Sequence, residues 1–113
     1  MRLKDLLLEG ALRSREVLDS CGNTEVRGIS SDSRSVRQGD LFFAITGATF
    51  DAKKIIPDVV ERGVVAVVYD GDLPDGIDDS RSLIAVHDVR EALSYAAHRF
   101  YQTPSLRIFF YST

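Results

Sequence analysis

Residues 29–51 carry the side chains best suited to chemistry, because they combine hydroxyls and charges with an apolar run. Serines surround Asp32 and Arg34, and the run from Leu41 to Ile45 follows the turn residue Gly39. Polar loops at the ends of buried strands are where folds bind nucleotides or sugars, because the strands form a rigid scaffold. The same residue types are also typical of plain turns. Residue types alone therefore leave a binding loop and a structural turn open.

Other catalytic and metal chemistries find little support in the sequence. His87 and His98 are the only histidines, and neither has a second histidine or Cys21 at a metal-site spacing. No serine lies in a Gly-x-Ser-x-Gly elbow, so a Ser-His-Asp arrangement is not indicated. The aspartates of residues 70–82 lack the spacing of a calcium loop, and we expect a solvated loop there.

A phosphate loop is also absent, because no glycine in the chain is followed by lysine. The Walker A motif needs Gly-Lys-Ser/Thr so that backbone amides surround a phosphate and the lysine reaches it. Lys53 and Lys54 are typical of a solvated helix start, with neutralisation of a phosphate as the alternative.

Length and composition indicate one globular domain. The chain has 113 residues, of which 44% are hydrophobic and 27% charged. A net charge of −3 gives no general attraction to nucleic acid or to anionic membranes. A single cysteine, the lack of a signal-peptide pattern and the lack of an apolar run of roughly 18 residues favour a cytoplasmic protein.

Hydrophobic periodicity predicts alternating helices and strands. The expected strands are residues 26–31, 41–45, 64–69, 83–86 and 106–111. We expect a short opening helix that ends at Gly10. A second helix should begin at about residue 55, with Val59 and Val60 on its inner face and Gly63 as its C-terminal cap. A third helix is expected over residues 89–101, with Asp88 as its N-terminal cap. The run 41–45 is apolar on both alternating faces, which requires helices on both sides of the sheet. The fold class predicted is therefore α/β, a single layered domain with a mixed or largely parallel sheet flanked by helices.

The central stretch resembles a family signature. The matching residues are Asp32-Ser33-Arg34, Val36, Gly39-Asp40-Leu41-Phe42, Ala44, Gly47 and Asp51. This pattern is similar to the N-terminal domain of Mur ligases. The resemblance covers nearly the whole chain after Val26, and Arg99-Phe100-Tyr101 with Pro104-Ser105-Leu106 is similar to the MurE branch.

The resemblance implies a role in peptidoglycan synthesis, and so in cell wall biogenesis, cell shape and cell division. MurE-type ligases add diaminopimelate or lysine to UDP-N-acetylmuramoyl-L-alanyl-D-glutamate, and their first domain binds the UDP moiety. By motif, the UDP contacts fall on Ser31, Ser33 and Ala48-Thr49-Phe50, with support from Arg34 and Asp51. ATP and magnesium are expected only for the full-length enzyme, so the chain itself should hold no cofactor, no metal site and no catalytic residue.

Two departures from the family pattern matter. Asp51-Ala52 stands where the family usually has Asp-Gly, and residues 109–113 stand where a glycine-rich phosphate loop would begin. We expect a UDP-binding domain over residues 1–105, followed by the start of a strand over 106–113 that would lead into an ATP-binding central domain. An excised domain, a truncated product and a frameshifted end all fit this pattern.

Two rival interpretations remain open. A MurF-type N-terminal domain would share the central motif. Alternatively, the chain is a non-enzymatic remnant or interaction module that self-associates through the apolar segment Phe109, Phe110 and Tyr111.

Overall fold

The computed structural model describes residues 1–13, 22–45, 55–71 and 83–101. Within these ranges four strands form one sheet in the order β1-β2-β3-β4. The strands are β1 Gly28–Ser30, β2 Asp40–Phe43, β3 Ala66–Tyr69 and β4 Leu83–Ala85. Each neighbouring pair is parallel, with Ser30 opposite Phe42 and Phe43 opposite Val68. The predicted α/β class is confirmed, and the described part of the sheet is wholly parallel.

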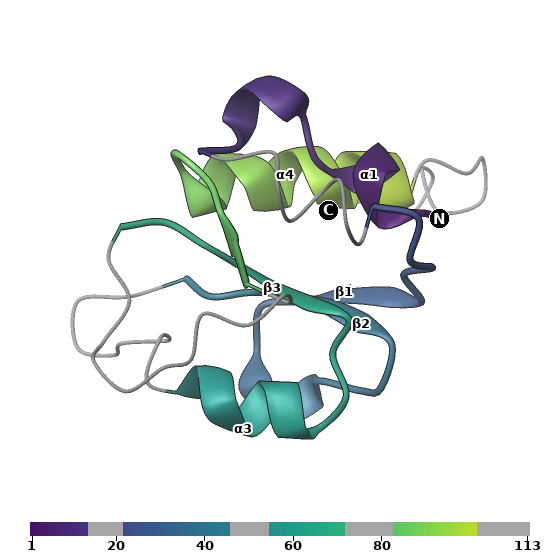
Figure 1. Ribbon diagram of the computed structural model, residues 1–113. Helices are drawn as coiled ribbons and strands as arrows, with labels where there is room; N and C mark the ends of the chain where they lie inside the picture. The colour runs from purple at the N-terminus through teal and green to yellow at the C-terminus, as the bar shows by residue number, and fades with distance from the viewer. Residues whose placement is uncertain (14–21, 46–54, 72–82, 102–113) are drawn as a thin grey trace, which may run out of the picture.

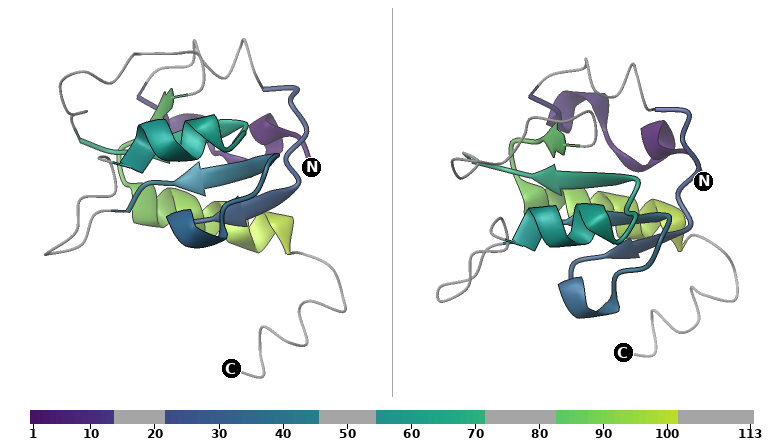
Figure 2. Two further views of the ribbon diagram at one scale, coloured as in Figure 1. Left: turned by 90° about the horizontal axis from the view of Figure 1, so that it is seen from below. Right: turned by 60° about the horizontal axis from the view of Figure 1, so that its bottom comes forward.

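Helices cover both faces of this sheet (Figure 1). α1 (Leu3–Leu6) and α4 (Val89–Phe100) lie on one face, and α3 (Ile56–Glu61) lies on the other. Figure 2 shows the short 3-10 turn η2 (Ser33–Ser35), between β1 and β2, on the same side of the sheet as α3. The chain therefore forms three layers, as the doubly apolar run 41–45 predicts.

β2 and the residue that follows it, Ala44, divide their side chains between two hydrophobic clusters. Leu41 and Phe43 pack with the α1 and α4 side, whereas Phe42 and Ala44 pack with the α3 side. All four side chains are buried. Alternation along a strand sends successive residues to opposite faces, so one short strand joins both cores.

The outer edge of β4 is covered by the N-terminal segment. Leu12 and Val86 form an antiparallel bridge. The amide of Arg13 donates to the carbonyl of Ala85 at 2.9 Å, and the amide of His87 donates to the carbonyl of Ala11 at 3.0 Å. These bonds satisfy an edge that would otherwise be open to another strand.

α4 begins at two carboxylates. Oδ1 of Asp88 accepts from the amides of Arg90 and Glu91, at 3.0 and 3.1 Å, which confirms the predicted cap. Oδ2 of Asp70, at the end of β3, accepts from the amide of Val89 at 2.8 Å. The second carboxylate links the helix start to the neighbouring strand and satisfies another of its free amides.

α3 starts at Ile56, close to the predicted position, with Pro57 in its first turn. Val59 is buried, but Val60 is 36% exposed, so the prediction that both valines lie on the inner face was wrong. Adjacent helical positions are about 100° apart, and this short helix turns only one of the two toward the sheet.

The chain reverses after α3 at Gly63, which has a φ of 95° and confirms the predicted left-handed cap. Its carbonyl accepts from the amide of Gly39 at 2.9 Å, and Gly39 also has positive φ, 91°. A Cβ at Gly63 would lie 3.0 Å from Cγ of Gln38. Two facing turns thus place β2 beside β3.

Gly63→Ala is expected to lower the free energy of unfolding by about 1–2 kcal/mol, because a side chain disfavours the left-handed conformation. Gly10→Ala is the matched control, since no atom lies within 4 Å of a Cβ at that position. The control should change stability by less than about 0.5 kcal/mol. Urea unfolding of both variants measures the difference, and equal stabilities would contradict the strain argument.

Candidate functional site

The candidate site is the hydroxyl loop, residues 30–35, which follows the carboxyl end of β1. In parallel sheets ligands bind at the carboxyl ends of strands, where the connecting loops gather. β1 and β2 are parallel neighbours, so the chain leaves β2 at the same edge of the sheet. β1 is hydrogen-bonded to the buried strand β2, which gives the polar side chains of the loop a fixed base.

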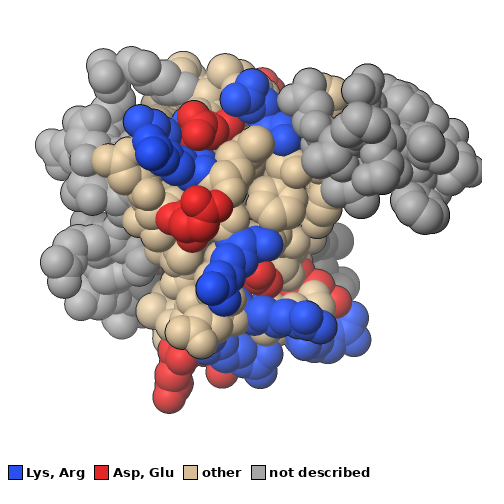
Figure 3. All heavy atoms as spheres, turned by 90° about the vertical axis from the view of Figure 1, so that its right-hand side faces the viewer, with Lys and Arg blue, Asp and Glu red and all other residues tan. Residues whose placement is uncertain are grey.

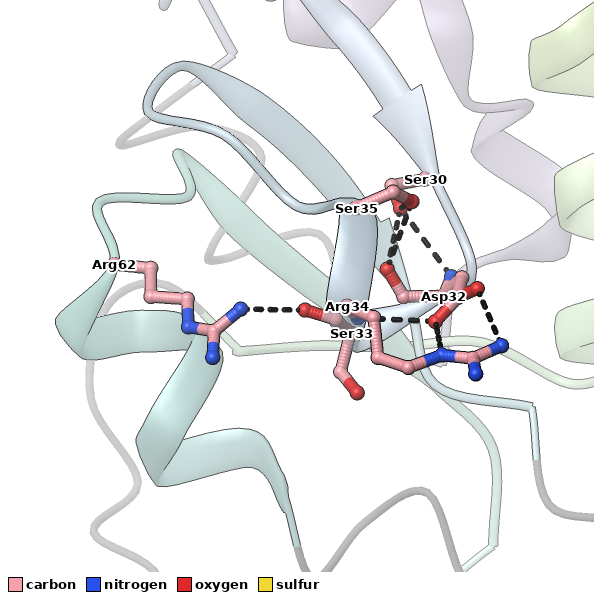
Figure 4. Close-up of polar contacts among 6 residues, drawn as sticks. All are labelled: Ser30, Asp32, Ser33, Arg34, Ser35 and Arg62. Carbon is pink, nitrogen blue, oxygen red and sulfur yellow. Dashed lines mark hydrogen bonds and ion pairs between the residues drawn. The ribbon is translucent and has the colours of Figure 1, made fainter.

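Asp32 organises the hydroxyl loop, as Figure 4 shows. Its Oδ1 accepts from the backbone amide of Arg34 at 2.9 Å and from Nε of Arg34 at 3.2 Å. Its Oδ2 accepts from Nη2 of Arg34 at 3.1 Å. The carboxylate therefore caps η2 and pairs with the guanidinium through two parallel bonds, the geometry that suits arginine and carboxylate.

Two of the serines are used to build the loop. The hydroxyls of Ser30 and Ser35 both donate to the carbonyl of Asp32, at 3.0 and 3.2 Å. Ser30 also accepts from the amide of Asp32 at 3.2 Å. These local side-chain bonds replace the backbone ladder, as is typical of serine and aspartate in turns. For Ser30 and Ser35 the structural-turn interpretation is therefore correct.

The loop re-enters the sheet through Asp40, a buried carboxylate. Its Oδ2 accepts from the amide of Arg37 at 2.9 Å and closes the turn before β2. A Cβ on Gly28, the residue opposite Asp40 in β1, would lie 2.6 Å from Oδ1 of Asp40. Gly28 thus leaves space for the carboxylate.

Ser31 and Ser33 remain available for a ligand. Neither hydroxyl has a hydrogen-bond partner within the described ranges, and Figure 4 shows the Ser33 side chain pointing away from the other labelled residues. A hollow of about 350 Å³ is lined by Ser31, Asp32, Ser33 and Arg34. Of the predicted contact residues, Ser31, Ser33 and Arg34 line this hollow, whereas Ala48, Thr49, Phe50 and Asp51 lie outside the described residues.

Charges at the hollow are balanced. The Arg34 guanidinium lowers the pKa of the Asp32 carboxyl by donating to it, and the Arg34 amide lowers it further. In turn, Asp32 raises the pKa of Arg34. The Arg34 side chain is 88% exposed and that of Asp32 49%, so water screens their attraction. The pair presents a polar surface with little net charge.

The face of the molecule that Figure 3 draws carries charges of both signs. Figure 3 shows the side on which the N-terminus lies, where basic and acidic side chains are interspersed with uncharged ones. Among the residues that the structure describes, no group of three or more His, Cys, Asp or Glu side chains is placed to hold a metal ion. No described helix is long and apolar enough to cross a membrane.

Comparison with protein-family models shows to which family the chain belongs. The family model described as "Mur ligase family, catalytic domain" matches residues 25–101. The chain belongs to the Mur ligase family. The match includes the hydroxyl loop, all four strands and α4.

Curated Mur ligase relatives match most of the chain. One is a UDP-N-acetylmuramoyl-L-alanyl-D-glutamate--2,6-diaminopimelate ligase of Parabacteroides distasonis, 35% identical over 96% of this chain and 21% of the relative. Another, with the same name, is from Bradyrhizobium diazoefficiens and is 41% identical over 89% of this chain and 19% of the relative. The chain spans about a fifth of the length of these relatives.

Solved Mur ligase structures share the fold. A MurF of Acinetobacter baumannii superposes with a TM-score of 0.60 over 87% of this chain and 20% of that chain, at 24% identity. The MurF ligase of Thermotoga maritima in complex with ADP gives 0.56 over 67% of this chain and 17% of that chain, also at 24% identity. The four-stranded parallel sheet with flanking helices is the fold of the Mur ligase N-terminal domain.

Sequence reasoning missed Arg62 as a residue of this site. Its Nη1 donates to the carbonyl of Ser33 at 2.7 Å, although the two residues are 29 positions apart. Its Nη2 also lies 3.4 Å from Oδ2 of Asp58, one helical turn earlier. The sequence predicted a helix that ends at the cap Gly63, just after Arg62, and this gave no sign of the contact.

Arg34→Met should raise the pKa of the Asp32 carboxyl toward the ordinary aspartate value of about 3.9, because the guanidinium donors are removed. Some lowering should remain, since the backbone amide of residue 34 still donates. Because the folded pKa is the lower one, the pair contributes stability above the ordinary pKa and loses it as the pH falls through the lowered value. Carboxyl carbon NMR titration measures the shift.

Arg37→Met is the control for the change in net charge, because Arg37 is exposed and its side chain is absent from the bonds to Asp32. In this variant the Asp32 carboxyl should titrate as in the parent chain. Equal titrations of the two variants would show that Arg34 does not cause the shift.

Proposed function

We propose that this chain is the UDP-binding domain of a MurE-type ligase and binds the uridine-nucleotide part of UDP-N-acetylmuramoyl-L-alanyl-D-glutamate. The observation that carries the proposal is the hollow at the end of β1, lined by the residues of the Asp32-Ser33-Arg34 motif. The names of the curated relatives support the choice of substrate. On this proposal, residues 1–105 form the UDP-binding domain of a ligase that acts in the cytoplasmic stage of peptidoglycan synthesis.

The hydroxyls of Ser31 and Ser33 would form hydrogen bonds with the ligand. Because the Asp32–Arg34 pair has little net charge, the hollow suits the neutral polar groups of uracil and ribose better than a diphosphate. Neutralisation of the diphosphate would then fall to other residues, with Lys53 and Lys54 as candidates. Ala48, Thr49 and Phe50 follow β2 and would complete the site, with Phe50 against the base or ribose.

Ligation itself requires groups that the described residues do not supply. They include no cluster able to hold magnesium, and the sequence has no Gly-Lys-Ser/Thr loop for ATP. ATP and magnesium would therefore belong to the rest of a full-length ligase. We expect this chain alone to bind nucleotide weakly and to have no ligase activity, because other domains would supply the remaining contacts.

A MurF-type domain is the alternative within the family. The two solved neighbours named above are MurF proteins, but at 24% identity they support only the shared fold. The curated relatives carry MurE-type names at 35% and 41% identity, which favours the diaminopimelate branch. Self-association through Phe109, Phe110 and Tyr111 stays a prediction, since these residues lie outside the described ranges.

Ser33→Ala should weaken UDP binding about five-fold, the loss expected for one hydrogen bond of about 1 kcal/mol. Folding should be nearly unchanged, since the Ser33 hydroxyl has no partner among the described residues. Titration with UDP, followed by calorimetry or NMR, measures the affinity.

Ser94→Ala is the matched control, because Ser94 is exposed on α4. It should bind UDP as the parent chain does. No binding by the parent chain at millimolar UDP would refute the proposed function, whereas equal affinities of the parent and Ser33→Ala would remove only Ser33 from the site.

A further inference from the structure

The peptide group that joins Ser33 to Arg34, here the 33–34 peptide group, is hydrogen-bonded at both ends (Figure 4). Its carbonyl, from Ser33, accepts from Nη1 of Arg62 at 2.7 Å. Its amide, from Arg34, donates to Oδ1 of Asp32 at 2.9 Å. Since a peptide group is planar, bonds at both ends fix its rotation and with it the backbone of Ser33.

Only one of these two bonds comes from outside the hydroxyl loop. The bonds among Ser30, Asp32, Arg34 and Ser35 set the shape of the loop but all lie within it. The bond from Arg62 crosses to α3 and is the link that places η2 against a helix of the fold.

Arg62 is well fixed for this role. Nη1 donates to the Ser33 carbonyl at 2.7 Å, and Nη2 lies 3.4 Å from Oδ2 of Asp58. Together these two contacts set the plane of the guanidinium. Its backbone amide donates to the carbonyls of Asp58 and Val59 at the end of α3. The helix itself is anchored by Ile56 and Val59, both buried in the core beneath the sheet.

We propose that Arg62 is a positioning residue of the nucleotide site: it fixes the 33–34 peptide group and thereby aims the Ser33 hydroxyl at the ligand. The inference rests on the proposed function, because Ser33 matters only if the nucleotide binds there. Among the described residues, those that line the hollow do not include Arg62. Its effect on binding passes through the carbonyl of Ser33.

NMR of the labelled chain tests the inference without ligand and with UDP. In Arg62→Met the amide resonance of Arg34 should move upfield, because a freely rotating peptide group donates less well to Asp32. The affinity for UDP should fall about five-fold, as for the loss of one charge-assisted bond in an exposed site. Arg62→Lys keeps one donor and should recover most of the affinity.

Two further variants make the test specific. Asp58→Asn removes the ion pair but leaves Arg62 in place, and we expect a loss of about two-fold in the same direction. Arg37→Met removes one exposed positive charge elsewhere and should leave both the Arg34 resonance and the affinity unchanged. Thermal unfolding shows whether each variant is folded; if Arg62→Met is not, the lysine and asparagine variants carry the test.

The outcomes separate this inference from the proposed function. An unmoved Arg34 resonance in folded Arg62→Met would overturn the positioning role, whatever the affinity. A moved resonance with parent-like UDP affinity would also overturn it and leave the proposed function intact. If the parent chain does not bind UDP, the proposed function fails, while the Arg34 resonance still reports whether Arg62 fixes the peptide group.

Discussion

The fold depends on one constraint, which is that β2 is buried on both faces. Phe42 faces one hydrophobic core and Phe43 the other, and neither side chain is exposed to solvent. A strand of this kind requires a helical layer above and below it and a strand on each side. α3 is thereby placed beneath the sheet, which brings the end of that helix beside the loop that follows β1. The position of Arg62 near Ser33 is thus a consequence of core packing.

Much of the fold could be predicted from local patterns. The apolar run 41–45, the left-handed Gly63 and the Asp88 cap each have a signal within a few residues, and the structure has all three. The exposure of Val60 was missed because α3 is short and its rotation is set by Val59 and Ile56 packing against the sheet. The presence of two adjacent valines in the hydrophobic pattern does not determine how the helix is rotated about its axis.

Only part of the site could be predicted, because the directions of its side chains, like the rotation of α3, depend on the folded backbone. Local chemistry around Asp32 indicated a loop of hydroxyls, but it did not separate Ser30 and Ser35, which bond within the loop, from Ser31 and Ser33. That division depends on which way each side chain points once the backbone is folded. A contact between distant parts of the chain, such as that of Arg62 with Ser33, arises from the packing of α3 beside η2 and leaves no local trace in the sequence.

The N-terminal segment has a further consequence for how the protein is made. Leu12 bridges to Val86, and the carbonyl of Asp5 accepts from Nε of Arg99, 94 residues later. Contacts so distant in sequence form only after the intervening chain has been synthesised. The N-terminal segment can therefore take up these contacts only after α4 has been synthesised, although it precedes the whole sheet in the sequence.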